Sequence, residues 1–122
     1  MWSNCLFVAL GGGLGAVGRY LLSLIAAPWS FPVMTLLTNF LGAVVIGAVA
    51  QAAGQLPMSK SAVLFLRTGL CGGFTTFSTF SLETVELLEQ GRWAAGGGYI
   101  LASVGLCLAG VLLGRALVWK IL

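Results

Sequence analysis

The sequence contains no histidine and no aspartate, and its only acidic residues are Glu83, Glu86 and Glu89. A Ser/His/Asp triad and a histidine-based metal site are therefore both excluded. The three cysteines are widely spaced inside apolar segments and form no CxxC pair, so we interpret them as small apolar residues rather than as metal ligands. These absences lead us to expect that the protein is not an enzyme.

Charge is also scarce, since 7% of the 122 residues are charged and 59% are hydrophobic. Soluble domains carry roughly 25% charged residues, so this composition predicts an all-α integral membrane protein surrounded by lipid. The net charge of +3 comes from six basic residues that are dispersed along the chain. Because they form no basic cluster, we expect no nucleic-acid partner.

The apolar residues fall into long segments that are separated by short breaks. A helix needs about 20 apolar residues to cross a bilayer, and the sequence predicts a single domain, 1–122, with four such spans. The predicted spans are about 3–26, 32–53, 62–88 and 93–119. Four tryptophans fall at their ends, as an interfacial aromatic belt requires. These are Trp2, Trp29, Trp93 and Trp119.

An even number of spans would place both termini and the polar segment 54–61 on one side of the membrane. The basic residues divide between the two sides with only a mild bias toward cytoplasmic termini. Such ambivalence suits a protein that inserts both ways up and assembles as an antiparallel dimer. Pairs of glycines four residues apart would let helices pack closely in lipid. These pairs are Gly11/Gly15, Gly69/Gly73 and Gly110/Gly114.

One glycine run, from Gly13 to Gly18, also matches the GxGxxG fingerprint of dinucleotide-binding proteins. A true site of that kind needs a parallel sheet and an acidic residue about 20 positions later. The first acidic residue of this chain is Glu83. We therefore interpret the run as a surface for helix packing.

The third predicted span contains the most unusual segment, Gly72-Gly73-Phe-Thr-Thr-Phe-Ser-Thr-Phe-Ser81, with two glycines and five hydroxyl residues. Irregular backbone at membrane depth is tolerated only where protein or a water-filled cavity surrounds it. We predict a helix break within 72–76 and a new half-helix from about Phe77, with Ser78 and Thr79 as hydrogen-bond donors. The alternative is an unbroken helix whose hydroxyls bond to its own carbonyls.

Two more polar residues lie inside predicted spans, and each has two interpretations. Arg19 either anchors its helix at the membrane interface or draws anions toward a pore. Asn39 either bridges two helices or offers its amide donors to a passing ligand. The deep polar groups are mostly amide and hydroxyl donors, and aromatic ring edges carry partial positive charge. That combination favours a small anion, although hydroxyls also accept hydrogen bonds.

Three stretches of the chain resemble the small dual-topology fluoride channels called Fluc or CrcB proteins, and the resemblance extends over essentially the whole sequence. The stretches are Gly-Gly-Leu-Gly-Ala-Val-Gly-Arg19-Tyr, Thr-Leu-Leu-Thr-Asn39-Phe-Leu-Gly and Arg67-Thr-Gly-Leu-Cys-Gly-Gly-Phe-Thr-Thr-Phe-Ser-Thr-Phe-Ser-Leu-Glu83. The last of them is long and unusual in composition.

The resemblance implies an antiparallel homodimer in the inner membrane with two fluoride pores, through which fluoride leaves the cytoplasm passively. It also implies a structural sodium ion at the dimer interface, bound by the backbone carbonyls of Gly72 and Thr75. The implied residues of the ion pathway are Arg19, Asn39, Phe77, Phe80, Glu83, Tyr99 and Ser103. One turn beyond Ser103, where a further hydroxyl is expected, the chain has Cys107, a weaker donor.

Two other membrane functions remain as alternatives at this point. A small multidrug exporter would also have four helices, but proton-coupled export of cations calls for a carboxylate in the membrane, normally in the first helix. No acidic residue precedes Glu83, which argues against that function. The second alternative is a membrane assembly subunit that conducts no ion and uses the polar segment for assembly alone.

Overall fold

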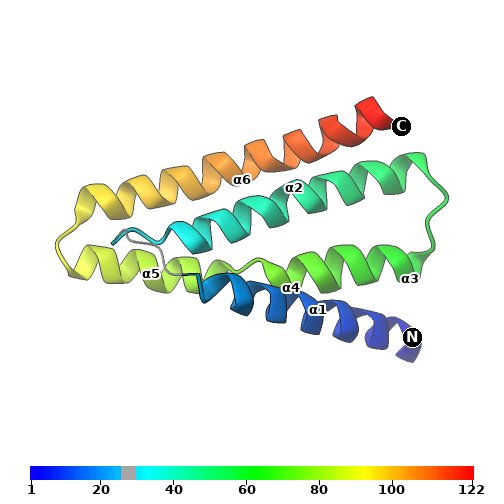
Figure 1. The fold of residues 1–122 in the computed structure, drawn as a ribbon, viewed down its shortest axis with the longest axis horizontal. Coiled ribbons are helices and arrows are strands. Elements are labelled where there is room, and N and C mark those ends of the chain that lie inside the picture. The colour runs from blue at the N-terminus through cyan, green and yellow to red at the C-terminus, as the bar shows by residue number, and fades with distance from the viewer. Residues whose placement is uncertain (26–29) are drawn as a thin grey trace.

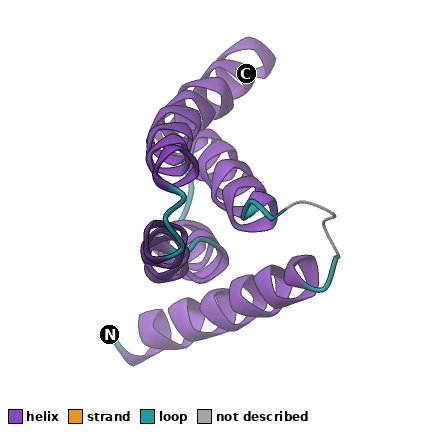
Figure 2. Cartoon of the chain, turned by 90° about the vertical axis from the view of Figure 1, so that its left-hand side faces the viewer, coloured by secondary structure: helices purple, strands orange, loops and turns teal. Residues whose placement is uncertain are grey.

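The computed structural model describes residues 1–25 and 30–122, and within these residues all regular structure is helical (Figures 1 and 2). The predicted interfacial Trp29 and the predicted end of the first span at residue 26 lie outside the described residues. The helices are α1 (Trp2–Ser23), α2 (Val33–Gln55), α3 (Lys60–Val63), the π-helix η1 (Leu64–Cys71), α4 (Gly72–Phe74), α5 (Phe77–Glu89) and α6 (Trp93–Ile121).

Three of these helices, α1, α2 and α6, are long and apolar enough to cross a membrane, with 22, 23 and 29 residues. At 1.5 Å per residue, even the shortest is about 33 Å long, which exceeds the roughly 30 Å of a bilayer's hydrocarbon core. The helix α1 ends at Ser23, a few residues before the predicted limit, whereas α2 and α6 each extend two residues further than predicted.

The remaining helical pieces, α3, η1, α4 and α5, follow one another along a single line beside the other helices (Figure 1). Both chain termini and the connection from α2 to α3 lie at one end of the molecule, and the connection from α5 to α6 lies at the other (Figure 1). Successive long segments of the chain therefore run in alternating directions along the molecule (Figure 1). Among them α2 packs closely along α6, and α1 packs against η1 and α4.

Glycine makes both of these close approaches possible, as the spacing in the sequence predicted. A Cβ atom added at Gly11 would collide with the carbonyl oxygen of Phe65, and one at Gly15 with that of Leu70. On the other pair of helices, a Cβ at Gly114 would collide with the carbonyl oxygen of Val44. Only glycine leaves room for backbones to approach this closely.

The turn between α5 and α6 is tight and lies between the predicted spans 62–88 and 93–119. Gly91 has a positive φ of 75°, a conformation that glycine adopts without steric cost. Its N–H donates to the carbonyl of Leu88, and the N–H of Arg92 donates to that of Leu87. This pair of hydrogen bonds is the Schellman motif, which ends a helix at glycine.

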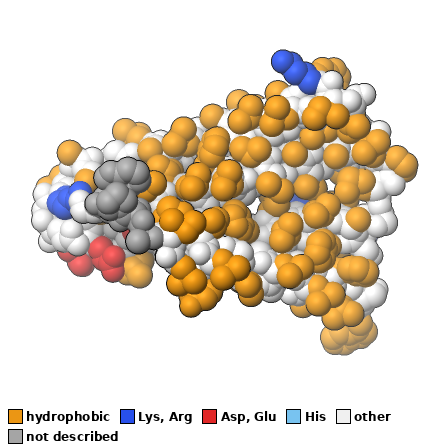
Figure 3. Space-filling view, in the orientation of Figure 1, with side chains coloured by type: hydrophobic (Ala, Val, Ile, Leu, Met, Phe, Trp, Pro, Cys, Tyr) orange, Lys and Arg blue, Asp and Glu red, His pale blue; other side chains and the backbone are white. Residues whose placement is uncertain are grey.

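Large apolar side chains cover much of the outer surface, and Figure 3 shows them spread over the central part of the molecule. The acidic side chains visible in that view gather at the end where α5 meets α6. Exposed apolar area of this extent is typical of a surface that faces lipid or a protein partner. The fold therefore fits a multi-pass membrane protein.

Candidate functional site

Two residues with extended backbone separate α4 from α5. Thr75 has φ −85° and ψ 156°, and Thr76 has φ −149° and ψ 116°. The helix α4 ends at Phe74 and α5 begins at Phe77, so the extended residues lie within the segment of glycines and hydroxyl residues. The methyl group of Thr75 fills the space beside Gly42 on α2, where a Cβ atom would collide with it.

The side chain of Asn39 on α2 holds this extended segment by two hydrogen bonds. Its Oδ1 accepts from the N–H of Thr76 at 2.8 Å, and its Nδ2 donates to the carbonyl of Thr76 at 3.1 Å. Both backbone groups, which a continuous helix would have satisfied, are thereby paired. Of the two interpretations of Asn39, the bridge between helices is present, and one amide N–H remains for another acceptor.

Thr76 also starts the next helix. Its Oγ1 accepts a hydrogen bond from the N–H of Thr79 at 3.1 Å, as an N-cap residue does. The hydroxyls of Thr79 and Ser78 lie 3.0 and 3.3 Å from the same oxygen. The predicted donors Ser78 and Thr79 therefore support the start of α5. The N-terminus of α5 carries partial positive charge, because its first N–H groups have no helical acceptor.

Arg19 on α1 reaches the other side of the interruption, where its Nε donates to the carbonyl of Gly73 at 3.2 Å. At the end of a helix the last carbonyls have no helical donor, so this bond satisfies one of them. In this structure Arg19 thus stabilises the end of α4.

An aromatic cluster lies just beyond the interruption. The ring of Phe80 lies 5.1 Å from that of Tyr99, and Phe31 meets Tyr99 edge-on at 5.3 Å. Tyr99 is fully buried and Phe80 is 9% exposed, whereas Phe77, 5.4 Å from Phe80, is 78% exposed. The two predicted pore phenylalanines therefore differ, one packing inside the chain and one pointing out of it.

The predicted hydroxyl residues of the last helix, Tyr99 and Ser103, lie four residues apart on one face of α6. Tyr99 donates from its hydroxyl to Oε1 of Glu83 at 3.4 Å. The hydroxyl oxygen of Ser103 is buried and has no hydrogen-bond partner among the described residues. Because a buried polar atom without a partner costs roughly 1–3 kcal/mol, Ser103 is a natural position for contact with a ligand.

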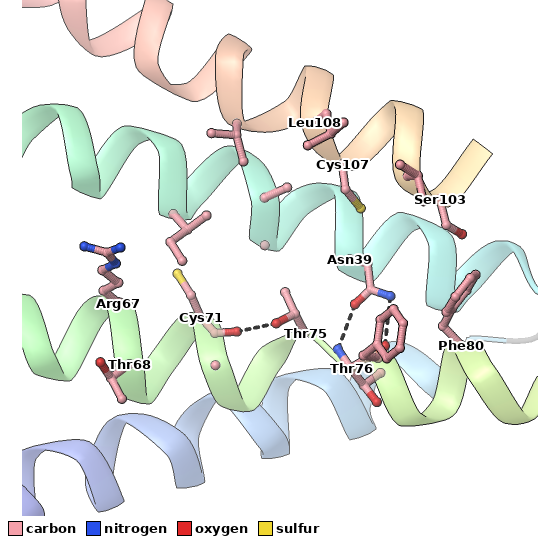
Figure 4. Close-up of a pocket in the computed structure, with 17 residues that line it drawn as sticks. Asn39, Arg67, Thr68, Cys71, Thr75, Thr76, Phe80, Ser103, Cys107 and Leu108 are labelled. Carbon is pink, nitrogen blue, oxygen red and sulfur yellow. Dashed lines mark hydrogen bonds between the residues drawn. The ribbon is translucent and has the colours of Figure 1, made fainter. Parts of the chain in front are cut away.

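A pocket of about 470 Å³ runs along α2, η1, the interruption and α6 (Figure 4). Its polar side chains belong to Asn39, Arg67, Thr68, Thr75, Thr76 and Ser103, and no carboxylate of the described residues lines it. Phe77 and Phe80 line it as well, together with Cys107. The amide and hydroxyl groups of this cavity include hydrogen-bond donors that can bind an anion.

The predicted cation ligands, Gly72 and Thr75, also line this pocket. Thr75 and Thr76 leave the helical path, so the carbonyl of Gly72 lacks its helical donor at Thr76, whose N–H is bonded to Asn39. Backbone carbonyls freed at a helix break are the type of ligand that binds sodium in membrane proteins. The carbonyls of Gly72 and Thr75 are therefore ligands of the type that suits the predicted sodium ion.

Not every predicted residue reaches this pocket. Arg19, Glu83 and Tyr99 are outside its lining, and Glu83 instead lines a smaller cavity of about 210 Å³ with Phe31 and Glu86. Two features were missed by sequence reasoning, namely the π-helix η1 and the presence of Arg67 in the pocket lining. A basic residue inside an apolar segment was the available signal for the second.

The sequence matches the family described as "CrcB-like protein, Camphor Resistance (CrcB)" over residues 6–115. A relative from Ruminiclostridium cellulolyticum is 45% identical over 118 residues, which cover 93% of this chain and 91% of the relative. One from Roseiflexus sp. is 48% identical over 115 residues, with coverage of 91% and 93%. A third, from Shewanella frigidimarina, is 47% identical over 122 residues, with coverage of 97% and 98%. All three are named "Fluoride-specific ion channel FluC".

Proposed function

This chain belongs to the CrcB-like protein family, and we propose that it is a passive, fluoride-selective channel that carries fluoride out of the cytoplasm. The observation that carries the proposal is the identity of 45% to 48% with relatives named fluoride-specific ion channels, over more than nine tenths of the chain. The protein is thus a multi-pass membrane transport protein and not an enzyme. We expect it in the inner membrane, because its relatives are bacterial and its long helices are apolar.

The pocket suits fluoride because its amide and hydroxyl groups include hydrogen-bond donors. Fluoride is small and strongly hydrated, so a pathway must replace the water that the ion loses. Asn39 retains one amide N–H after it bonds to Thr76, and Ser103 offers an unpaired hydroxyl. The absence of a carboxylate from the pocket lining removes a repulsive charge.

Phe77 and Phe80 would supply the apolar walls of the pathway. Their ring edges carry partial positive charge, and both rings border the pocket. A narrow passage between rings would admit fluoride and exclude the larger chloride ion. Tyr99 and Glu83 are hydrogen-bonded to each other beyond Phe80 and outside the pocket lining, and we expect them to border the pathway next to the pocket.

The arrangement in the membrane that we propose has four spans, with α3 to α5 forming the third and the interruption at Thr75 and Thr76 lying near mid-membrane. Two copies in opposite orientations would form the channel, with one pore on each side of the dimer. The open pocket and the 78% exposure of Phe77 support this arrangement, because lipid alone would leave the polar groups of the pocket without partners.

A structural sodium ion at the dimer interface completes the proposal. The carbonyls of Gly72 and Thr75 would hold it, and both residues line the pocket. When bound, the ion would supply a fixed positive charge that satisfies carbonyls left without helical donors. The chain itself contributes the extended backbone at Thr75, and the N–H of Thr76, the helical donor for Gly72, is bonded to Asn39 instead.

Fluoride efflux from liposomes that contain the purified protein tests this function. We expect rapid loss of fluoride once valinomycin allows potassium to balance the charge, and no matching loss of chloride. Vesicles without protein provide the background rate. Equal loss of chloride would refute selectivity, and an absence of efflux from protein that is monodisperse in detergent would refute the channel function.

A further inference from the structure

Arg67 projects from η1 into the pocket described above (Figure 4). Its side chain is exposed and makes no hydrogen bond or ion pair with another described residue. Arg19 differs, because its Nε is bonded to the carbonyl of Gly73. Of these two arginines, Arg67 is the one whose guanidinium is free to meet a ligand.

The surroundings of Arg67 make an uncompensated charge expensive. The other residues that line the pocket are uncharged, and the nearest of them along the chain are Thr68 and Cys71. Charged side chains within membrane helices cost several kcal/mol at the bilayer centre and usually face a watery cavity or a partner. A guanidinium in this position therefore indicates that a negative group enters the pocket.

A second and independent observation points to the same kind of ligand. Ser103, on α6, is one of the residues that line the same pocket, and its hydroxyl oxygen is buried and lacks a partner among the described residues. Asn39 and Ser103 are both neutral donors, and both lie further along the pocket from Arg67 (Figure 4). The pocket thus has a fixed cation toward one end and unsaturated donors further along.

We propose that Arg67 is an anion-attracting residue of this pathway, which raises the local concentration of fluoride and passes the ion to the donors at Asn39 and Ser103. The proposal rests on the proposed function, because it assumes that fluoride is the ion that moves. A cleft with one sign of charge and apolar walls concentrates the opposite ion by focusing the field. Arg67 acts on ion entry, and the narrow passage between the phenylalanines acts on selectivity.

The test measures the initial rate of fluoride efflux from liposomes against fluoride concentration. Arg67→Gln should raise the half-saturating fluoride concentration by about tenfold, at the low end of what such fields achieve. Arg67→Lys preserves the charge and should stay within about twofold of the unmodified protein. The matched control is Arg115→Gln, because Arg115 is an exposed arginine on α6 that is not among the pocket residues.

Ionic strength separates a charge effect from a structural one. The deficit of Arg67→Gln should shrink as potassium glutamate rises from about 0.05 to 0.5 M, because salt screens the field. A concentration dependence identical to that of the unmodified protein would overturn the inference. An equal increase of the half-saturating concentration in Arg67→Lys would also overturn it. So would a deficit that appears only in vesicles of anionic lipid, because Arg67 would then be a membrane anchor.

Failure of the channel function itself would look different, since the unmodified protein would then release no fluoride. In that case anion binding is measured directly, as the rise in melting temperature of the purified protein on addition of potassium fluoride at a fixed sodium concentration. Arg67→Gln should lose most of this rise and Arg115→Gln should keep it. An equal rise in both variants would overturn the inference.

Discussion

Replacing Asn39 with alanine removes both hydrogen bonds that hold the extended segment against α2. The carbonyl of Thr76 loses the Asn39 amide donor at 3.1 Å, and the N–H of Thr76 loses the amide oxygen at 2.8 Å. Neither backbone group has a helical partner that could replace Asn39. Each hydrogen bond contributes about 1 kcal/mol net, and each buried group left unpaired costs about 1–3 kcal/mol. Because the site is only partly buried, we expect a loss of about 2–4 kcal/mol in the free energy of unfolding.

Two measurements check this expectation. Denaturation of the purified protein in detergent gives the loss of stability, and amide hydrogen exchange reports the opening of the N–H of Thr76, which should exchange faster in Asn39→Ala. The control is Ser23→Ala, since the Ser23 hydroxyl makes an exposed bond to its own helix, and exposed substitutions of this kind change stability by about 0.5 kcal/mol or less.

The reasoning would be refuted if Asn39→Ala lost no more stability than Ser23→Ala and left the exchange of Thr76 unchanged. Fluoride efflux from the same variant addresses the second role of Asn39. Because the amide would both hold the interruption and donate to the ion, efflux should fall even at a temperature where the variant is fully folded.

Three further predictions concern packing and the ion pathway. Gly15→Leu should prevent normal assembly, because the new side chain meets the backbone of Leu70, and the protein should then aggregate in size-exclusion chromatography. Gly13→Leu is the control and should be tolerated, because no described residue lies within 4 Å of its Cβ position. Ser103→Ala should raise the free energy of unfolding by about 1 kcal/mol, by removing an unpaired buried hydroxyl, and should lower fluoride efflux. Phe80→Ile should slow fluoride efflux, and intact flux in this variant would remove Phe80 from the pore.

The turn and the glycine contacts could be predicted from sequence because their causes are local. Gly91 ends α5 through its positive φ, a property of the residue itself. The four-residue spacing of Gly11 and Gly15 places both on one face of α1, and their contacts with Phe65 and Leu70 confirm the predicted close approach. In both cases residues close together in the sequence determine what is predicted, namely the end of α5 and the face of α1 that allows close packing.

The partners of the polar side chains could not be predicted, because they depend on which helices meet. Asn39 and Thr76 are 37 positions apart, and Arg19 and Gly73 are 54 apart. The sequence marked Asn39 and Arg19 as costly residues that need partners, but it could not identify the acceptors. The π-helix η1 gave no local signal either, since its sequence resembles that of an ordinary apolar helix.

The interruption and the donor-lined pocket have one physical origin. A break in a membrane helix exposes backbone groups that lipid cannot satisfy, so the fold recruits Asn39 and Arg19 to satisfy some of them. Each recruited side chain has more donors than the backbone uses, since an amide has two N–H groups and a guanidinium has five. The unused groups include one amide N–H of Asn39 and most of the guanidinium N–H groups of Arg19. They add to the unpaired hydroxyl of Ser103. Stabilising the break therefore already biases this region toward anions, and fluoride selectivity requires only that the passage also be narrow.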